Sequence, residues 1–385
     1  MVFLLVIIYA TFISLGLPSA LLGSGWPSMY QELGVSIANA GIVSMIISGG
    51  TIFSSFISSK IIRRFGAALT VSACVTIMGI SLMGFSFSGH FFLLCLWAIP
   101  LGLGTGAVDA AVNNFVALHY ESKHMNWLHC FWGVGATISP LIMAFTLGQW
   151  NSWSRGYQLV GIIQLILAVV LFSTLPLWKK ATNKDVQDNH TNKKHLSLKE
   201  LIALPAAKQL AMVLFCCCAI GAVVGLWGSS FLVITKGITT ETAASWIAIH
   251  FVGMTVGRLF LGFLSMKLSS RQLLKIGLTL IALGIMMLFL PLPDIMLLVG
   301  LFLIGFGCSP IFPCILHETP NNYGSTNSQA MIGIQMGCAY TGATFMPPLF
   351  GLIAERTGYQ AFPYFLGALL LVMIIMIWSS PKIEE

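Results

Sequence analysis

The chain has 385 residues, of which 57% are hydrophobic and only 8% are charged. Soluble domains carry about a quarter of their residues as charged side chains. This composition therefore excludes a soluble protein and predicts an all-α protein that crosses a membrane many times. The net charge of +7 does not imply a nucleic-acid partner, because the cations lie in short segments between apolar runs, as in the cytoplasmic loops of membrane proteins.

Apolar runs of about 20 residues, each enough to cross a hydrocarbon core of about 30 Å, follow one another along the chain. They predict twelve transmembrane helices, at 3–29, 36–58, 67–88, 91–118, 125–148, 157–178, 208–235, 242–265, 272–291, 295–317, 327–352 and 359–380. The first run lacks the basic residues that begin a signal peptide, so we expect a retained helix. The long polar segment 179–207 is the predicted cytoplasmic linker between two six-helix bundles, 1–178 and 208–385.

The loops between the predicted helices alternate in charge. Fifteen Lys and Arg residues fall on one side of the membrane, and three, Arg155, Lys236 and Arg356, fall on the other. Cytoplasmic loops are enriched in Lys and Arg. We therefore expect a multi-pass protein of the cell membrane with both termini and the linker in the cytoplasm.

The two halves repeat several residue types at a constant offset of 207 positions. The offset relates the residues Gly50, Lys60, Arg64 and Pro140 to Gly257, Lys267, Arg271 and Pro347. This indicates an internal duplication, with parallel halves related by an axis along the membrane normal. Lys60 and Arg64 follow the second helix, where cations complement the helix dipole. Both are candidate gating residues. The alternative is that they only determine the orientation of the chain in the membrane.

The predicted fourth helix carries a carboxylate, Asp109, inside its apolar segment. An acid at this depth costs roughly 2.5–3.5 kcal/mol on translocon scales and is by default a functional-site candidate. Asn113 lies one turn further on the same helical face, and Gly102, Gly104 and Gly106 permit close approach of another helix. Asp109 is the predicted proton-coupling residue and Asn113 a predicted substrate contact. Two alternatives stay open: Asp109 pairs with another side chain only to hold two helices together, or it binds sodium rather than a proton as the coupling ion.

Further candidates lie in both halves. In the predicted fifth helix, Asn126 and His129 share one face, with Trp132 at its edge, and all three are predicted to bind substrate. His129 is also a candidate for proton coupling, because histidine has the side-chain pKa nearest neutrality; packing is its alternative role. In the second half, Trp227 and Gln335 are predicted to bind substrate. The Trp227 ring can pack against the apolar C–H face of a sugar, and the Gln335 side-chain amide can form hydrogen bonds with its hydroxyl groups.

Arg258 lies inside the predicted eighth helix, seven residues before its end. A cation at this position needs a partner or must snorkel toward the membrane surface. It is predicted either to act as a gate or counter-ion or to snorkel.

The nine cysteines all fall in hydrophobic stretches, and none forms a Cys-x-x-Cys pair. They are predicted to be small buried side chains rather than a disulfide or metal framework. No metal or other cofactor is expected.

The stretch from Gly50 to Gly66 resembles the loop between helices 2 and 3 of the major facilitator superfamily, where the usual signature is Gly-x-x-x-Asp-Arg-x-Gly-Arg-Arg. Ser59 stands where that signature has its acid. The resemblance covers the whole chain and implies the major facilitator fold, with twelve helices in two pseudo-symmetric bundles and transport by alternating access.

The run Asp109-Ala110-Ala111-Val112-Asn113, with Asn126-Trp127-Leu128-His129, is similar to the helix 4 and 5 region of the fucose/proton symporter branch. On this resemblance, Asp109 takes the place of the proton-linked carboxylate and His129 stands at a sugar-contacting Gln. The symporters of that branch also have an acid in their first helix, whereas the first helix here has none.

These patterns predict a transporter and no enzyme, since the chain has no Walker-type Gly-Lys-Ser/Thr sequence and no His-Glu-x-x-His sequence. The expected function is symport of a proton with a small polar solute, a sugar or glycoside, by a monomer. A proton-coupled exporter of drugs or metabolites and a sodium-coupled sugar importer are the alternatives.

Overall fold

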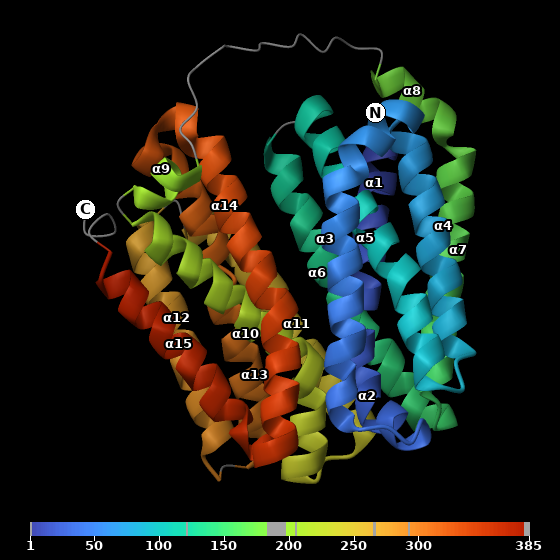
Figure 1. Cartoon of the computed structure of the whole chain (residues 1–385), viewed down its shortest axis with the longest axis vertical. Coiled ribbons are helices and arrows are strands. Elements are labelled where there is room, and N and C mark those ends of the chain that lie inside the picture. The colour runs from blue at the N-terminus through green and yellow to red at the C-terminus, as the bar shows by residue number, and fades with distance from the viewer. Residues whose placement is uncertain are drawn as a thin grey trace. The chain divides into compact units, whose positions relative to one another are not determined.

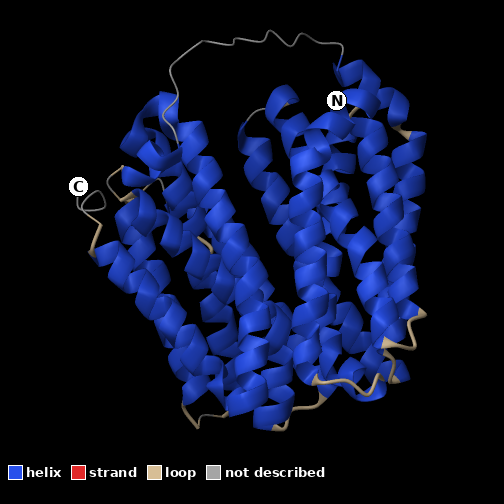
Figure 2. Ribbon diagram, in the orientation of Figure 1, coloured by secondary structure: helices blue, strands red, loops and turns tan. Residues whose placement is uncertain are grey.

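The computed structural model describes residues 2–120, 122–182, 198–204, 206–264, 267–291 and 293–380. In these ranges the chain forms helices joined by short loops, and no strand occurs (Figure 2). The helices, labelled in Figure 1, are α1 (Val2–Gly16), α2 (Leu21–Glu32), α3 (Ala40–Phe65), α4 (Ala67–Ser86), α5 (Phe91–His119), α6 (Ser122–Trp150), α7 (Trp153–Ser173), α8 (Leu175–Thr182), α9 (Leu198–Ala203), α10 (Ala207–Lys236), α11 (Thr240–Leu264), α12 (Ser270–Phe289), α13 (Asp294–Cys308), α14 (Ile311–Thr357) and α15 (Phe362–Trp378). Three 3-10 turns, η1 (Leu17–Ala20), η2 (Ile37–Asn39) and η3 (Tyr359–Ala361), lie between them.

Eleven helical segments of the described chain are long and apolar enough to cross a membrane. They overlap eleven of the twelve predicted spans. The first, Phe3–Glu32, runs through α1, η1 and α2, because the 3-10 turn, with Pro18 near its start, joins the two helices without a loop. The remaining predicted span, 327–352, lies in the second part of α14.

Helix α14 turns back on itself. The Thr319 hydroxyl donates a hydrogen bond of 2.9 Å to Oε1 of Gln335, sixteen residues away. In a straight α-helix that separation spans about 24 Å, so the chain reverses between these two residues. The first arm of α14 therefore completes the predicted tenth span, which begins in α13, and the second arm contains the predicted eleventh. The turn between the arms keeps helical geometry.

The chain divides into two compact units. Unit 1 contains Met1–Asp188 and Leu232–Ala248, and unit 2 contains Asn189–Phe231 and Ile249–Glu385. Most of each predicted bundle falls in one unit, but the segment 232–248, from the end of α10 to the first turns of α11, belongs with unit 1. Glu241 of this segment lies beside α6, where a Cβ added to Gly148 would be 3.9 Å from the Glu241 Cβ.

Each unit contains a helix crossing that is equivalent in position to one in the other unit. In unit 1, α3 meets α5 at Gly50, where an added Cβ would lie 3.3 Å from the Cα of Gly102. In unit 2, α11 meets the C-terminal end of α13 at Gly257, where an added Cβ would clash with the hydroxyl of Ser309, the residue that follows α13. Both members of the second pair stand 207 positions after those of the first. This shared crossing supports the internal duplication predicted from the sequence.

Each unit has faces on which large apolar side chains are exposed. Phe56 is 81% exposed, Phe92 77% and Trp378 76%. A water-soluble monomer rarely leaves so much apolar surface uncovered. Together with the eleven spans, these faces are those of a protein whose helices contact lipid.

Candidate functional site

Asp109 and Asn113 form a hydrogen-bonded pair on α5. The Asn113 side-chain amide donates to Oδ1 of Asp109 at 2.9 Å and to its backbone carbonyl oxygen, also at 2.9 Å. Both side chains are half-buried, within the candidate span Phe91–Val116. The helix therefore brings together the two residues whose spacing predicted a shared face, and holds the carboxylate in a fixed orientation.

Glycines set the position of this pair. A Cβ on Gly102 would clash with the carbonyl oxygen of Ile47, and a Cβ on Gly106 with that of Thr51, so α5 lies directly against the backbone of α3. The Thr51 hydroxyl donates to the Gly102 carbonyl at 3.2 Å, and the Ser55 hydroxyl to the Gly106 carbonyl at 3.3 Å. This contact ends one turn before Asp109 and anchors the backbone that carries it.

The residues of the fifth span that are predicted to bind substrate, Asn126, His129 and Trp132, lie on α6. His129 is exposed, and its ring meets the edge of Phe12 on α1, with ring centroids 5.8 Å apart. Trp132 is half-buried, and its backbone carbonyl oxygen lies where a Cβ on Gly16 would be. Asn126 belongs to α6, but its side chain lies outside the described residues. Contacts of His129 and Trp132 with α1 place this face beside the first span.

Two candidates from the second half are fully buried in unit 2. The Trp227 indole N–H donates to the Pro347 carbonyl oxygen at 2.7 Å, and its ring contacts Phe350 and Tyr359. Oε1 of Gln335 accepts the hydrogen bond from Thr319, and its Nε2 has no hydrogen-bond partner among the described residues. In this structure, the indole nitrogen of Trp227 already donates a hydrogen bond within the protein, whereas the amide nitrogen of Gln335 has no acceptor among the described residues.

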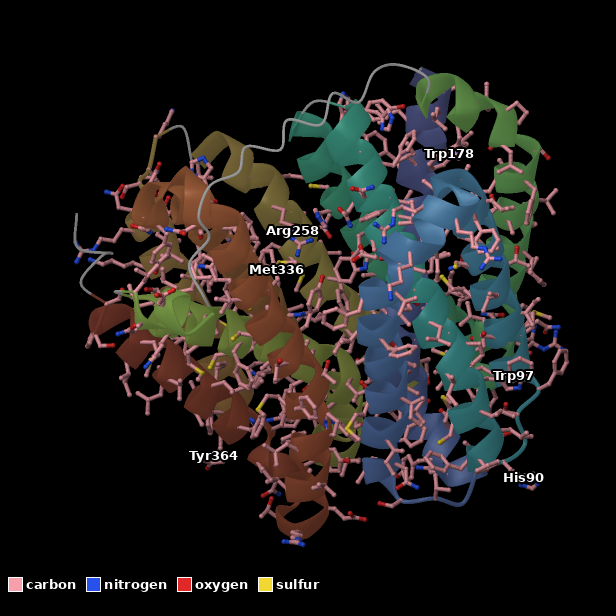
Figure 3. All side chains as sticks on the ribbon, turned by 45° about the horizontal axis from the view of Figure 1, so that its top comes forward. His90, Trp97, Trp178, Arg258, Met336 and Tyr364 are labelled. Carbon is pink, nitrogen blue, oxygen red and sulfur yellow. The ribbon has the colours of Figure 1, made fainter. Side chains whose placement is uncertain are left out.

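The three predicted gating residues lie in different surroundings. Lys60 and Arg64 are exposed on the last turns of α3, and the Arg64 guanidinium lies 5.5 Å from the Phe65 ring centroid. Arg258, labelled in Figure 3, is half-buried on α11, with Nη2 3.8 Å from the Met254 sulfur. Arg258 therefore lies partly buried along its own helix, while the α3 cations are on the surface.

An aromatic and histidine cluster in unit 1 was missed by sequence reasoning. Tyr9 of α1 and Nδ1 of His124 on α6 form a hydrogen bond of 2.7 Å. The ring of Phe115 stacks on His119 at 4.3 Å and contacts Trp178 of α8 at 4.7 Å. The cluster links α1, α5, α6 and α8, and the only signal for it in the sequence is the run of aromatic and histidine residues around 115–124.

Tyr120 lies beside this cluster, between α5 and α6. Its ring meets His124 edge-on, with centroids 5.7 Å apart. Burial raises the pKa of the Tyr120 hydroxyl, and the neighbouring Tyr9 raises it further. The hydroxyl is therefore neutral at physiological pH, and it has no hydrogen-bond partner among the described residues.

No cluster of three or more His, Cys, Asp or Glu side chains with the arrangement of a metal site occurs in the part of the chain that the structure describes. The chemistry available at the Asp109–Asn113 pair is that of a carboxylate and an amide, which bind protons, cations and hydroxyl groups.

Comparisons with known proteins agree with this architecture. The chain is 25% identical over 332 residues to the glucose/mannose transporter GlcP of Bacillus subtilis, covering 80% of this chain and 77% of that protein. It is 23% identical over 389 residues to Bypass of stop codon protein 6 of Saccharomyces cerevisiae, covering 91% and 77%.

Solved structures share the fold. The nucleoside transporter NupG superposes with a TM-score of 0.73 at 15% identity, covering 97% of both chains. A bacterial homologue of the human lysosomal transporter Spinster superposes with a TM-score of 0.72 at 13% identity, covering 97% of this chain and 95% of that one.

The family model described as Major Facilitator Superfamily matches residues 3–317 and, in a second match, residues 211–384. Together the two matches cover nearly the whole chain. The protein belongs to the Major Facilitator Superfamily of membrane transporters.

Proposed function

We propose that the protein is a secondary active transporter that takes up a small polar solute, a sugar or glycoside, together with a proton. The hydrogen-bonded pair of Asp109 and Asn113 carries this proposal. A carboxylate inside a membrane span is costly, and such acids commonly form ion sites or proton relays. Here Asn113 orients the carboxylate with a hydrogen bond of 2.9 Å, so Asp109 is the proposed site of proton binding and release.

A sugar is the proposed solute because both units offer hydrogen-bonding groups suited to hydroxyls. In unit 1, the Asn113 amide shares the α5 face with Asp109, and His129 and Trp132 lie along α6. In unit 2, the buried Gln335 has a donor with no partner among the described residues, and a buried donor without an acceptor is unfavourable by about 1–3 kcal/mol. A relative named as a glucose/mannose transporter supports the same class.

The orientation proposed for the chain has both termini and the segment between α8 and α9 on the cytoplasmic side of the cell membrane. The excess of Lys and Arg in alternate loops supports it. Lys60 and Arg64 then lie at the cytoplasmic end of α3, where we propose that they act in gating during alternating access.

Purified protein in proteoliposomes loaded with a pH-sensitive dye tests the proposal. Monosaccharides are added outside one at a time, with and without sodium, to the unsubstituted protein and to Asp109→Asn. Acidification of the lumen by one sugar is expected. The substitution should abolish it while exchange of radiolabelled sugar across the membrane continues, because Asn cannot release a proton but keeps a similar shape.

Other outcomes of this assay replace the proposal. Sugar uptake that requires sodium and leaves the lumen pH unchanged assigns Asp109 to sodium coupling, which a carboxylate with an amide oxygen also suits. Transport of a cationic dye, lost in Asp109→Asn, with no response to any sugar identifies an exporter.

A further inference from the structure

Three helices of unit 2 pack closely around Met254. A Cβ added to Gly221 of α10 would lie 3.6 Å from the Met254 methyl carbon, and a Cβ added to Gly305 of α13 would lie 3.1 Å from the Met254 backbone nitrogen. The small residues on both sides bring α10, α11 and α13 within side-chain reach of one another.

Two cysteine thiols meet one turn away from this contact. Cys217 lies one turn before Gly221 on α10, and Cys308 lies one turn after Gly305 on α13. The Cys217 sulfur donates a hydrogen bond of 3.7 Å to the Cys308 carbonyl oxygen, and the two side chains interact electrostatically. Cys217 is 4% exposed and Cys308 5%, so the protein interior surrounds the pair.

Arg258 is the charged group of this neighbourhood. It lies one turn after Met254 on α11, with its guanidinium against the Met254 sulfur, and it interacts electrostatically with Cys217. The site thus combines two sulfur ligands with a positive charge.

We propose that Cys217 and Cys308 form a dithiol site that a thiophilic centre, such as a trivalent arsenical, bridges between α10 and α13. In the reaction with phenylarsine oxide, two S–H bonds break and two As–S bonds form, and the oxygen leaves with both protons as water. Arsenic stays trivalent, so no oxidant is needed. A direct disulfide would instead require an oxidant to remove two electrons from the pair of thiols, whereas the arsenical bridge forms without one.

The flanking Cys216 and Cys218 are the competing ligands. Successive residues of a helix project about 100° apart, so neighbours along the chain do not face each other. The bridge proposed here joins residues 91 positions apart instead. Because both thiols are nearly inaccessible in this conformation, the reaction requires α10 and α13 to separate, and its rate reports that opening.

The test uses the full-length protein in detergent with phenylarsine oxide as the probe. After excess arsenical is washed away with a monothiol, iodoacetamide labels the remaining thiols, and peptide mass spectrometry identifies the protected cysteines. We expect one arsenical per chain, protection of Cys217 and Cys308, and release by dimercaptopropanol. Cys217→Ala and Cys308→Ala should each lower retention about a hundredfold, because a single thiol lacks the chelating partner.

Cys216→Ala, Cys218→Ala and Cys314→Ala are the matched controls and should retain the arsenical. Protection of Cys216 with Cys217 or Cys218, or retention unchanged in Cys308→Ala, would overturn the proposal. The mapping of protected cysteines in the unsubstituted protein decides the result even where a substituted chain does not fold.

Discussion

The Trp227 indole nitrogen donates a hydrogen bond of 2.7 Å to the carbonyl oxygen of Pro347, and this bond ties α10 to the second arm of α14. The Trp227 side chain is completely buried, with Phe350 and Tyr359 against its ring. Its interactions in this structure are therefore with the protein interior. The predicted role of Trp227 as a sugar platform stays a prediction that requires this part of unit 2 to open.

Replacing Trp227 with Phe removes the N–H while keeping an aromatic ring. Loss of the bond and of indole volume should destabilise the protein by about 1–3 kcal/mol, seen as a lower midpoint of thermal unfolding in detergent. Trp378→Phe makes the same chemical change at a side chain that is 76% exposed and should leave the midpoint nearly unchanged. Equal midpoints for the two variants would contradict a structural role for the Trp227 bond.

Substitution of Gly102 by Ala should separate α3 from α5, because the new methyl group would clash with the Ile47 carbonyl oxygen. Overpacking of this kind costs about 1–3 kcal/mol. Gly49→Ala is the matched control on α3, since no atom lies within 4 Å of an added Cβ. That change should stabilise the helix by about 0.5–1 kcal/mol. Thermal unfolding should therefore shift in opposite directions for the two variants; a shift in the same direction would argue against the close crossing.

The start of α7 is fastened to the end of α2 by the Trp153 indole, which donates a hydrogen bond of 2.6 Å to Oε2 of Glu32. Glu32→Ala leaves this buried N–H without its acceptor and should destabilise the protein by about 1–3 kcal/mol. Glu32→Gln keeps an amide oxygen in place and should recover more than half of the loss. Urea or thermal unfolding measures both changes. An equal loss for Ala and Gln would mean that the hydrogen bond is not responsible.

Removal of the Asn113 amide should weaken the proposed coupling site without abolishing it. Hydrogen bonds to charged groups contribute about 1.5–3 kcal/mol, so Asn113→Ala should slow proton-coupled uptake by about tenfold or more in the proteoliposome assay. The neighbouring Asn114 is exposed, and Asn114→Ala should transport at nearly the unsubstituted rate. Similar losses in both variants would point to a general effect on α5 rather than on Asp109.

Local features of this protein follow directly from its sequence. The spans can be placed because a membrane helix must be apolar over about 20 residues. The pairing of Asp109 with Asn113 can be expected because residues four apart on a helix are always neighbours. The close contact made by Gly102 and Gly106 follows for the same reason, since both lie on the α5 stripe that meets α3.

Contacts between distant segments were decided only by the tertiary structure. The bonds from Tyr9 to His124 and from Trp227 to Pro347 join residues more than 100 positions apart, and Cys217 meets Cys308 across 91 positions. Apolar periodicity says which face of a helix is buried but not which helix covers it, so it cannot name these partners. The sequence thus determined the helices and the carboxylate on α5, while packing between helices decided which buried polar groups are satisfied and by what.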